Sequence, residues 1–284
     1  MAKDTFFTQT QTMNIGGKLL DLTTPKVMGI VNITPDSFYG GSRFNTEKEI
    51  LTQVEKMLSA GADMLDLGAY STRPGAEDVS ATEEANRLLP ALKIIKINFP
   101  EAIISIDTFR ANLARMAVEE GAHIINDISG GEMDSEMFAA IAHLQVPYIL
   151  MHSRGTPKTM YALNVYDDLM GEILLYFSQK IHQLRALGVK DIVIDPGFGF
   201  AKNREQNFSL LNHLADFKLL GLPLLAGLSR KSMVWKTLDI SPEQALNGTS
   251  ILNTVALQNG AKILRVHDVA EAKQCIKLLA LLGN

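Results

Sequence analysis

Polar residues that could bind or transform a charged ligand follow the short apolar runs of this 284-residue chain. Seven runs stop at such a cluster and an eighth stops close to one, the clusters being 32–36, 71–75, 107, 126–127, 152, 195–197, 229–231 and 265–267. Parallel strands closed into a barrel point the same way, so groups at their C-terminal ends converge on one mouth. We therefore expect one pocket rich in both carboxylates and cations.

Arg265 and His267 flank the last of these strand ends. Side chains two residues apart on a strand lie on the same face, and with Arg73 they could bind a phosphate-like anion. Arginine binds phosphate through two parallel hydrogen bonds, and barrels often bind phosphate after their last two strands. The alternative interpretation is a cluster of salt bridges on the rim.

The segment Ser229-Arg230-Lys231-Ser232 opens a helix after the seventh strand. Helix N-termini bind anions through free amide groups, so a small carboxylate could lie near Ser232. Lys231 could instead point into the pocket and donate to a heterocycle. A basic helix start that faces solvent is the competing interpretation, although the helix dipole disfavours positive charge there.

Asp107, Asn126 and Asp195 end three different strands. Buried carboxylates need partners, and a heterocycle with ring N–H groups and an amino group would satisfy all three residues. Two separated carboxylates could also catalyse glycoside hydrolysis. Sugar sites usually offer aromatic platforms, however, and the one tryptophan, Trp235, is not at a strand end.

Metal chemistry is restricted by the six histidines, which form no HxH or HxxxH pair. A zinc ion held only by protein ligands is therefore not expected. Magnesium often takes one protein oxygen together with substrate phosphates and water. Asn32 could supply that oxygen, or could simply cap a loop.

Two loops, 32–45 and 68–79, are long for their place and carry rigid stretches at 34–38 and 71–75. Loops of that length are usually functional. Phe38 is costly to expose and is expected to cover a ligand, so the two loops could form a lid over a second subsite. The alternative is ordinary turn structure from proline and glycine.

The composition fits a soluble intracellular protein of one domain. The chain is 46% apolar, and its net charge of −4 gives no basic surface for nucleic acid. Its only cysteine, Cys275, suits a reducing cytoplasm. Neither an apolar run long enough for a membrane span nor a signal sequence is recognised.

The patterns predict an α/β fold, a (β/α)8 TIM barrel with a short N-terminal β-hairpin. The hairpin, in residues 1–26, would cover the barrel bottom, and 27–284 would form a single domain. Strands are expected near 27–31, 63–67, 102–107, 123–127, 147–151, 191–195, 223–228 and 262–266. Helices are expected near 46–59, 80–96, 110–120, 134–143, 165–187, 203–219, 242–258 and 268–282, several ending at glycine.

Taken together, these segments resemble the dihydropteroate synthase family over about residues 13–284. The runs 28–38 and 71–75 are similar to its two signatures, and 106–107, 125–127, 195–200, 229–232 and 265–268 match its later blocks in order. The resemblance implies a cytoplasmic homodimeric barrel enzyme. Such an enzyme joins 6-hydroxymethyl-7,8-dihydropterin diphosphate to p-aminobenzoate with Mg²⁺ and releases diphosphate.

The resemblance also implies a role for each matching residue. It makes Asn32 the magnesium ligand. It implies a diphosphate site of Thr72, Arg73, Arg265 and His267. It implies a pterin site of Asp107, Asn126, Met151, Asp195 and Lys231. It implies a p-aminobenzoate site of Phe38, Pro74, Phe200, Ser229 and Ser232. The implied catalytic residues are Asp107, Lys231 and Asp36.

Some positions depart from the family pattern, and other functions remain possible on the sequence alone. Ala69-Tyr70 replaces the usual Gly-Glu, Tyr39 replaces a small or acidic residue, and 152–154 differs from the usual Met-Gln. The alternatives are a corrinoid-linked methyltransferase of similar fold, a Schiff-base aldolase using Lys231, and a pterin-binding protein without activity.

Overall fold

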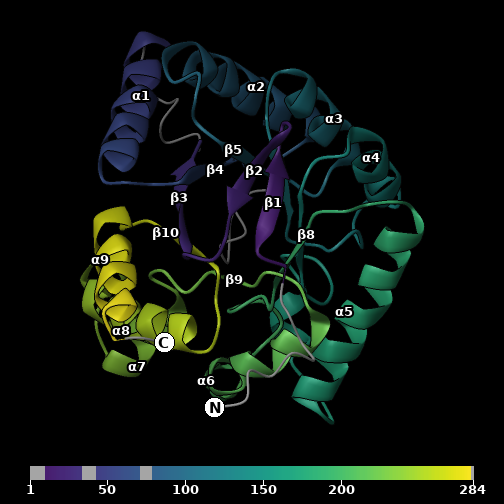
Figure 1. Ribbon diagram of the computed structural model, residues 1–284, viewed down its shortest axis with the longest axis vertical. Helices are drawn as coiled ribbons and strands as arrows, with labels where there is room; N and C mark the ends of the chain where they lie inside the picture. Colours follow the sequence, from purple (N-terminus) through teal and green to yellow (C-terminus); the bar gives the residue numbers. More distant parts are fainter. Residues whose placement is uncertain (1–9, 34–42, 71–78, 283–284) are drawn as a thin grey trace.

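A ring of parallel strands lies at the centre of the molecule (Figure 1). The computed structural model describes residues 10–33, 43–70 and 79–282. Its eight barrel strands are β3 (Lys26–Asn32), β4 (Met64–Gly68), β5 (Ile104–Asp107), β6 (Ile124–Asp127), β7 (Tyr148–Met151), β8 (Ile192–Asp195), β9 (Leu225–Ala226) and β10 (Ile263–Val266). They pair in the order β8-β7-β6-β5-β4-β3-β10-β9, and a bridge between Ile194 and Leu224 closes the ring. The predicted barrel is confirmed.

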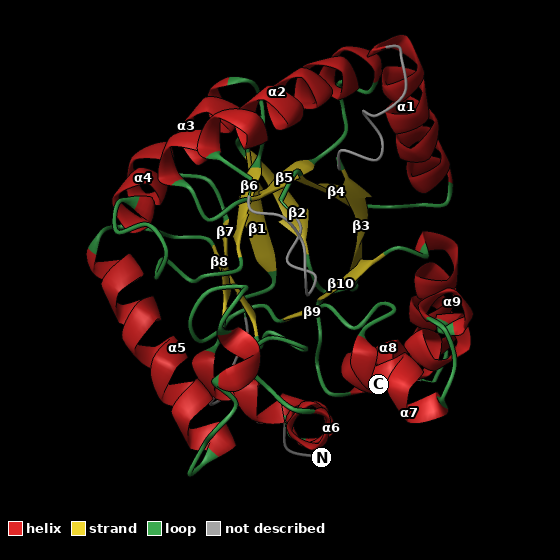
Figure 2. Ribbon diagram, turned by 180° about the vertical axis from the view of Figure 1, so that it is seen from behind, coloured by secondary structure: helices red, strands yellow, loops and turns green. Residues whose placement is uncertain are grey.

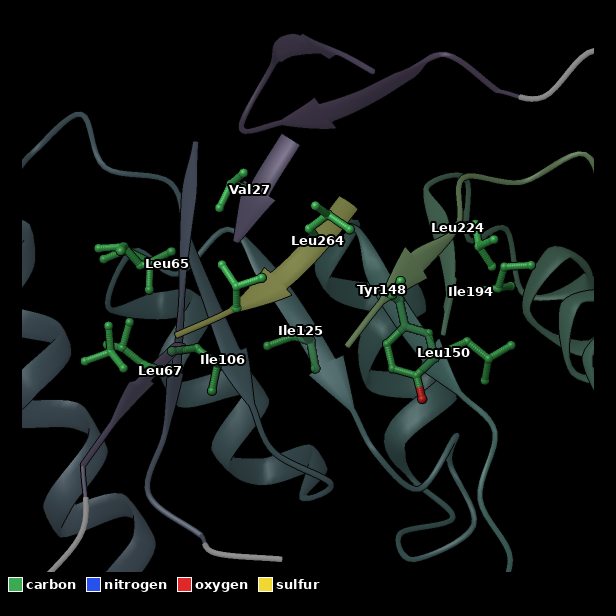
Figure 3. Packing of buried hydrophobic residues seen from close by; sticks show 14 of the residues in the cluster. Val27, Leu65, Leu67, Ile106, Ile125, Tyr148, Leu150, Ile194, Leu224 and Leu264 are labelled. Carbon is green, nitrogen blue, oxygen red and sulfur yellow. The ribbon is translucent and has the colours of Figure 1, made fainter. Parts of the chain in front are cut away.

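Alternation along each strand separates an outer face from an inner face. The outward residues are apolar, and Figure 3 labels Leu65, Ile106, Ile125, Tyr148 and Leu150 among them. They form one buried cluster with apolar residues of the surrounding helices. Burial on both faces explains why these strands read as continuous apolar runs in the sequence.

The N-terminal end of the barrel is closed by the predicted hairpin, β1 (Thr12–Ile15) and β2 (Lys18–Asp21). Figure 1 shows it lying across the ring. Met13, Ile15 and Leu22 form a second apolar cluster with inward residues of seven strands, which are Met28, Met64, Ile124, Ile149, Val193, Leu225 and Ile263. This apolar layer seals one end, so the opposite mouth is the end at which a polar ligand can enter. The division into residues 1–26 and a 27–284 domain stays a prediction.

A layer of helices surrounds the strands (Figure 2). The described helices are α1 (Arg43–Ser59), α2 (Ala81–Asn98), α3 (Ala111–Glu119), α4 (Met137–Leu144), α5 (Leu169–Ala186), α6 (Arg204–Asn212), α7 (Ser232–Leu238), α8 (Leu246–Gln258) and α9 (Val269–Ala280). Within the described segments, no helix has the length and apolar character needed to cross a membrane.

Two helix predictions need correction. The expected helix 203–219 is α6 followed by a separate 3-10 helix, Leu214–Leu220, because the chain changes its hydrogen-bonding pattern at His213. The expected helix 242–258 begins as the 3-10 turn Pro242–Gln244 before α8. The short helix α7 was recognised only by its start, and it places two helices between β9 and β10.

Candidate active site

The mouth of the barrel contains an arginine held between two carboxylates from different strands. Arg265 of β10 donates from Nε to Asp66 Oδ2 at 2.6 Å and from Nη2 to Asp107 Oδ2 at 2.8 Å. Asn126 of β6 donates to the same Asp66 oxygen at 2.9 Å. Three of the predicted site residues are thus brought together: Asp66 joins Arg265 to Asn126, and Arg265 joins Asp66 to Asp107.

Asp66 is the site residue that sequence reasoning missed. It lies in the middle of β4, inside a run that reads as apolar, and its side chain is fully buried. An isolated carboxylate at such a depth would be very unfavourable. The signal that could have found it is the acid itself, since an aspartate inside a buried strand requires a cationic or amide partner on another strand.

Burial and charge shift the pKa values of this cluster. Desolvation raises the pKa of Asp107 to about 7, and the carboxylates of Asp66, Asp127 and Asp195 push it in the same direction, whereas Arg265 opposes the shift. Burial disfavours the charged guanidinium of Arg265, but the carboxylates of Asp66 and Asp107 outweigh that effect and raise its pKa. Asp107 can therefore change its charge near neutral pH, while Arg265 stays a cation.

A second group of predicted residues lies around Lys231. Its ammonium donates to the Phe198 carbonyl and lies 4.9 Å from the centre of the Phe200 ring. A Cβ on Gly227 would lie 3.7 Å from Lys231 Nζ and 3.9 Å from Asp195 Oδ2, so both charged groups border the same glycine backbone. Burial lowers the pKa of Lys231 to about 8, and the Asp195 carboxylate opposes the shift.

An apolar wall stands beside these polar groups. Met151, Phe109 and Ile128 form a small buried cluster at the strand ends, and the half-buried Phe200 and Tyr70 pack against it. Met151, predicted to contact the pterin, and Phe200, predicted to contact p-aminobenzoate, therefore belong to one surface. A flat ring could lie on this wall while its polar edge meets carboxylates and an amide.

Ser229 and His267 connect the ends of β9 and β10. Ser229 Oγ lies 3.0 Å from His267 Nδ1 and accepts a hydrogen bond of 3.1 Å from the His267 backbone N–H. Because Ser229 is buried, this contact fixes the orientation of the His267 imidazole. The two residues, predicted for neighbouring subsites, are in direct contact.

The loop after β8 is held by Lys202, a buried residue that the sequence did not single out. Its ammonium donates to the carbonyls of Gly197 and Phe200 at 3.1 and 3.0 Å and lies 3.0 Å from His152 Nδ1. Burial lowers the pKa of Lys202 well below its ordinary value. Lys202 therefore stabilises the loop that supplies the Phe198 carbonyl and the Phe200 ring.

The remaining predicted residues are not brought into these contacts. Asn32 ends β3 with an exposed side chain, and Ser232, the first residue of α7, is exposed as well. Five others lie outside the described residues, namely Asp36, Phe38, Thr72, Arg73 and Pro74.

The barrel mouth places acids, an amide and two cations beside an apolar wall. Such an arrangement suits a flat heterocycle with an anionic tail. The chain matches the family of pterin binding enzymes over residues 28–267. It is 45% identical over 257 residues to the dihydropteroate synthase of Synechocystis sp.. The match covers 89% of this chain and 88% of that relative. The chain belongs to the dihydropteroate synthases, the transferases that act in folate biosynthesis.

Solved structures agree with this assignment. A Yersinia pestis dihydropteroate synthase in complex with a sulfonamide drug is 40% identical, with a TM-score of 0.89, and the match covers 95% of this chain and 98% of that one. The Xanthomonas albilineans dihydropteroate synthase with 4-aminobenzoic acid is 36% identical, with a TM-score of 0.88, covering 97% of this chain and 100% of that one.

Proposed function

We propose that this chain joins 6-hydroxymethyl-7,8-dihydropterin diphosphate to p-aminobenzoate and releases diphosphate. The observation that carries the proposal is Arg265, a permanent cation held between Asp66 and Asp107 at the mouth. In such a site the guanidinium can bind a diphosphate, and the carboxylates can stabilise positive charge on the ring that the diphosphate leaves. The Xanthomonas relative solved with 4-aminobenzoic acid supports the second substrate.

In this proposal the pterin ring lies against Met151 and meets polar groups along its edge. Asp107, Asn126, Asp195 and Lys231 offer acceptors and donors that match ring N–H groups, an amino group and a carbonyl. The support is their convergence: Asp107 and Asn126 are register partners on β5 and β6, and Asp195 and Lys231 border Gly227. Sulfonamides, bound by the Yersinia relative, would compete at the p-aminobenzoate site.

The diphosphate is proposed to bind Arg265 and His267, with Thr72 and Arg73 of the undescribed loop. Asn32 would hold Mg²⁺ there, and the ion would supply charge that stabilises the departing diphosphate. The donor fits, because an amide oxygen suits magnesium. Asn32 pairs in register with Gly68, whose Cβ position would be 3.6 Å from Asp107 Oδ2, so the two side chains belong to the same rim.

The proposed reaction begins with cleavage of the bond between the pterin methylene carbon and the diphosphate oxygen, and the electron pair leaves with diphosphate. The carboxylate of Asp107, with that of Asp36, stabilises the cation that remains on the pterin. Such preorganised charge is usually the largest contribution to catalysis. The amine nitrogen of p-aminobenzoate then bonds to the methylene carbon and loses a proton. Phe200, Ser229 and Ser232, with Phe38 and Pro74, would hold that substrate.

One assay separates this function from its alternatives. Purified protein with Mg²⁺ and pterin diphosphate should release diphosphate and form 7,8-dihydropteroate in equal amounts only when p-aminobenzoate completes the reaction. A methyltransferase-type barrel or an inactive pterin-binding protein would form no dihydropteroate. Trapping of a carbonyl substrate on Lys231 by borohydride would instead support the aldolase.

We also propose a homodimer in the cytoplasm. The support for the dimer is a set of exposed apolar side chains on α8 and α9 and beyond the end of α9, which are Ile251, Leu278, Leu281 and Leu282. The support for the location is the single cysteine, Cys275, because a reducing compartment does not select for disulfides.

A further inference from the structure

Arg230 lies between two proposed site residues, Ser229 and Lys231, but its side chain serves another purpose. Its guanidinium donates from Nε to Asp268 Oδ2 and from Nη2 to Asp268 Oδ1, both at 2.8 Å. Nη1 donates to the carbonyls of Glu243 at 2.8 Å and Pro242 at 3.2 Å. All three nitrogens are thus engaged by protein acceptors, which indicates a structural task rather than contact with substrate.

The backbone at Arg230 is in an unfavourable conformation. Its φ is +53°, in the left-handed region that a residue with a Cβ rarely adopts. Its N–H donates to the hydroxyl of the buried Thr249 on α8 at 3.1 Å. Such a conformation persists only where the surroundings enforce it. This turn directs the Arg230 side chain toward Asp268, whereas Lys231 reaches the Phe198 carbonyl in the site.

Asp268 is also used in an unusual way. It is the N-cap residue of α9, where an aspartate normally accepts a hydrogen bond from the first turn of its own helix. Among the described residues its side chain makes no such capping bond, and both carboxylate oxygens accept from Arg230 instead. The bidentate geometry is the strongest form of an arginine–carboxylate pair.

The backbone pairing does not explain how these two segments stay in register. The ladder between β9 and β10 covers only two residue pairs, Leu225 with Ile263 and Ala226 with Leu264. Beyond it, Ser229 contacts His267 and the next pair, Arg230 and Asp268, continues the connection. Beyond the end of the β9–β10 backbone pairing, these two successive side-chain contacts connect the two segments next to the proposed site.

We propose that the Arg230–Asp268 pair is a positioning device that holds Ser229 and Lys231 at a fixed place relative to His267. The inference rests on the proposed function, since it assigns p-aminobenzoate and pterin contacts to one segment and a diphosphate contact to the other. Arg230 is a positioning residue and not a catalytic one. Its loss should misplace both segments together, and a shift of about 1 Å can cost about 100-fold in rate.

The test compares Arg230→Lys, Asp268→Asn and the double variant with the wild type. Each single variant should raise the KM for p-aminobenzoate and weaken binding of inorganic diphosphate with Mg²⁺, measured by calorimetry, by about 10-fold or more. The double variant should be no worse than the poorer single variant, because residues that act as a pair are not additive. Asp268→Glu should restore part of the activity. Arg87→Lys, which changes an arginine paired with Glu83 on α2, is the matched control.

The outcomes are distinguishable. Variants that melt earlier but keep the wild-type KM and diphosphate affinity would overturn the proposal and leave a purely structural salt bridge, and so would fully additive effects. If Arg230→Lys does not fold, Asp268→Asn carries the same expectation, because it removes the charge of the pair and keeps the shape of the side chain. A wild type without synthase activity would refute the proposed function, whereas the diphosphate titrations would still decide whether the pair positions an anion site.

Discussion

At the scale of single residues, Asp66 shows that the site also contains a group from the middle of a strand, in addition to the groups at the strand ends. Asp66 accepts hydrogen bonds from Arg265 and from Asn126, and so joins the proposed diphosphate and pterin subsites. The sequence predicted both of these partners because they follow apolar runs. It did not predict Asp66, because the partner that makes its burial possible lies 199 residues away. Chemistry at strand ends is visible in a sequence, whereas pairing across a barrel is not.

The raised pKa of Asp107 and the lowered pKa of Lys231 predict a bell-shaped pH profile. The Asp107 pKa is about 7, so its carboxylate, which the mechanism requires, is lost as pH falls through that value. The Lys231 pKa is about 8, so its charge is lost as pH rises through that value. The profile of kcat/KM for the pterin substrate should have limbs at these two values, because it reports groups of the free enzyme.

A variant assigns the alkaline limb of that profile. Asp195 keeps the Lys231 pKa from falling further, so Asp195→Asn should move this limb to lower pH while total activity declines. A limb that stays in place in Asp195→Asn would mean that another group titrates there.

At the scale of elements, the sequence predicted strands more accurately than the connections after them. The five expected glycine ends of helices all have positive φ, and these are Gly61, Gly121, Gly188, Gly221 and Gly260. The connection after β9 was harder to predict, because α7 has only seven residues, too few for periodicity to show where the helix ends. The role of Arg230 was equally hidden, since a basic residue at a helix start gives no sign that it pairs with the start of another helix.

The loop after β8 should tolerate no side chain at Gly197. Its φ is +72°, and a Cβ there would lie 2.0 Å from the His152 backbone carbonyl, which cannot move without disturbing β7. Gly197→Ala should lower the free energy of unfolding by more than about 3 kcal/mol, or prevent folding. Gly188→Ala is the control, with φ +86° and nothing within 4 Å of the added carbon. It should cost about 1 kcal/mol. Equal midpoints in urea for the two variants would show that the contact with His152 is unimportant.

At the scale of the whole molecule, the barrel uses its two ends differently. The N-terminal end is filled by an apolar layer and the hairpin, and the C-terminal end carries the charged groups. The interior layer that separates them contains Asp66 and Asn126, so the polar site begins inside the barrel. The sequence predicted this polarity from the direction of the strands. The conformations of loops 34–42 and 71–78, with their five proposed site residues, stay untested predictions.

The proposed homodimer belongs to the same scale and can be tested by substitutions on the surface. Ile251 of α8 and Leu278 of α9 are 55% and 66% exposed. Replacing both with lysine should convert a homodimer into a monomer, because two buried charges at an apolar interface are strongly unfavourable. Light scattering coupled to gel filtration gives the mass. Leu175→Lys, on α5 with 58% of Leu175 exposed, should stay dimeric. A monomeric wild type, or a double variant of unchanged mass, would disprove the proposed interface.

The measurement that tests the account most directly is the steady-state rate of Asp107→Asn beside its affinity for diphosphate. The variant retains the shape of the side chain and removes the charge proposed to stabilise the pterin cation. We expect kcat to fall by about 100-fold or more, as for other losses of a preorganised electrostatic group, while inorganic diphosphate with Mg²⁺ binds within a few-fold of wild type. Near-normal turnover in Asp107→Asn would contradict the account.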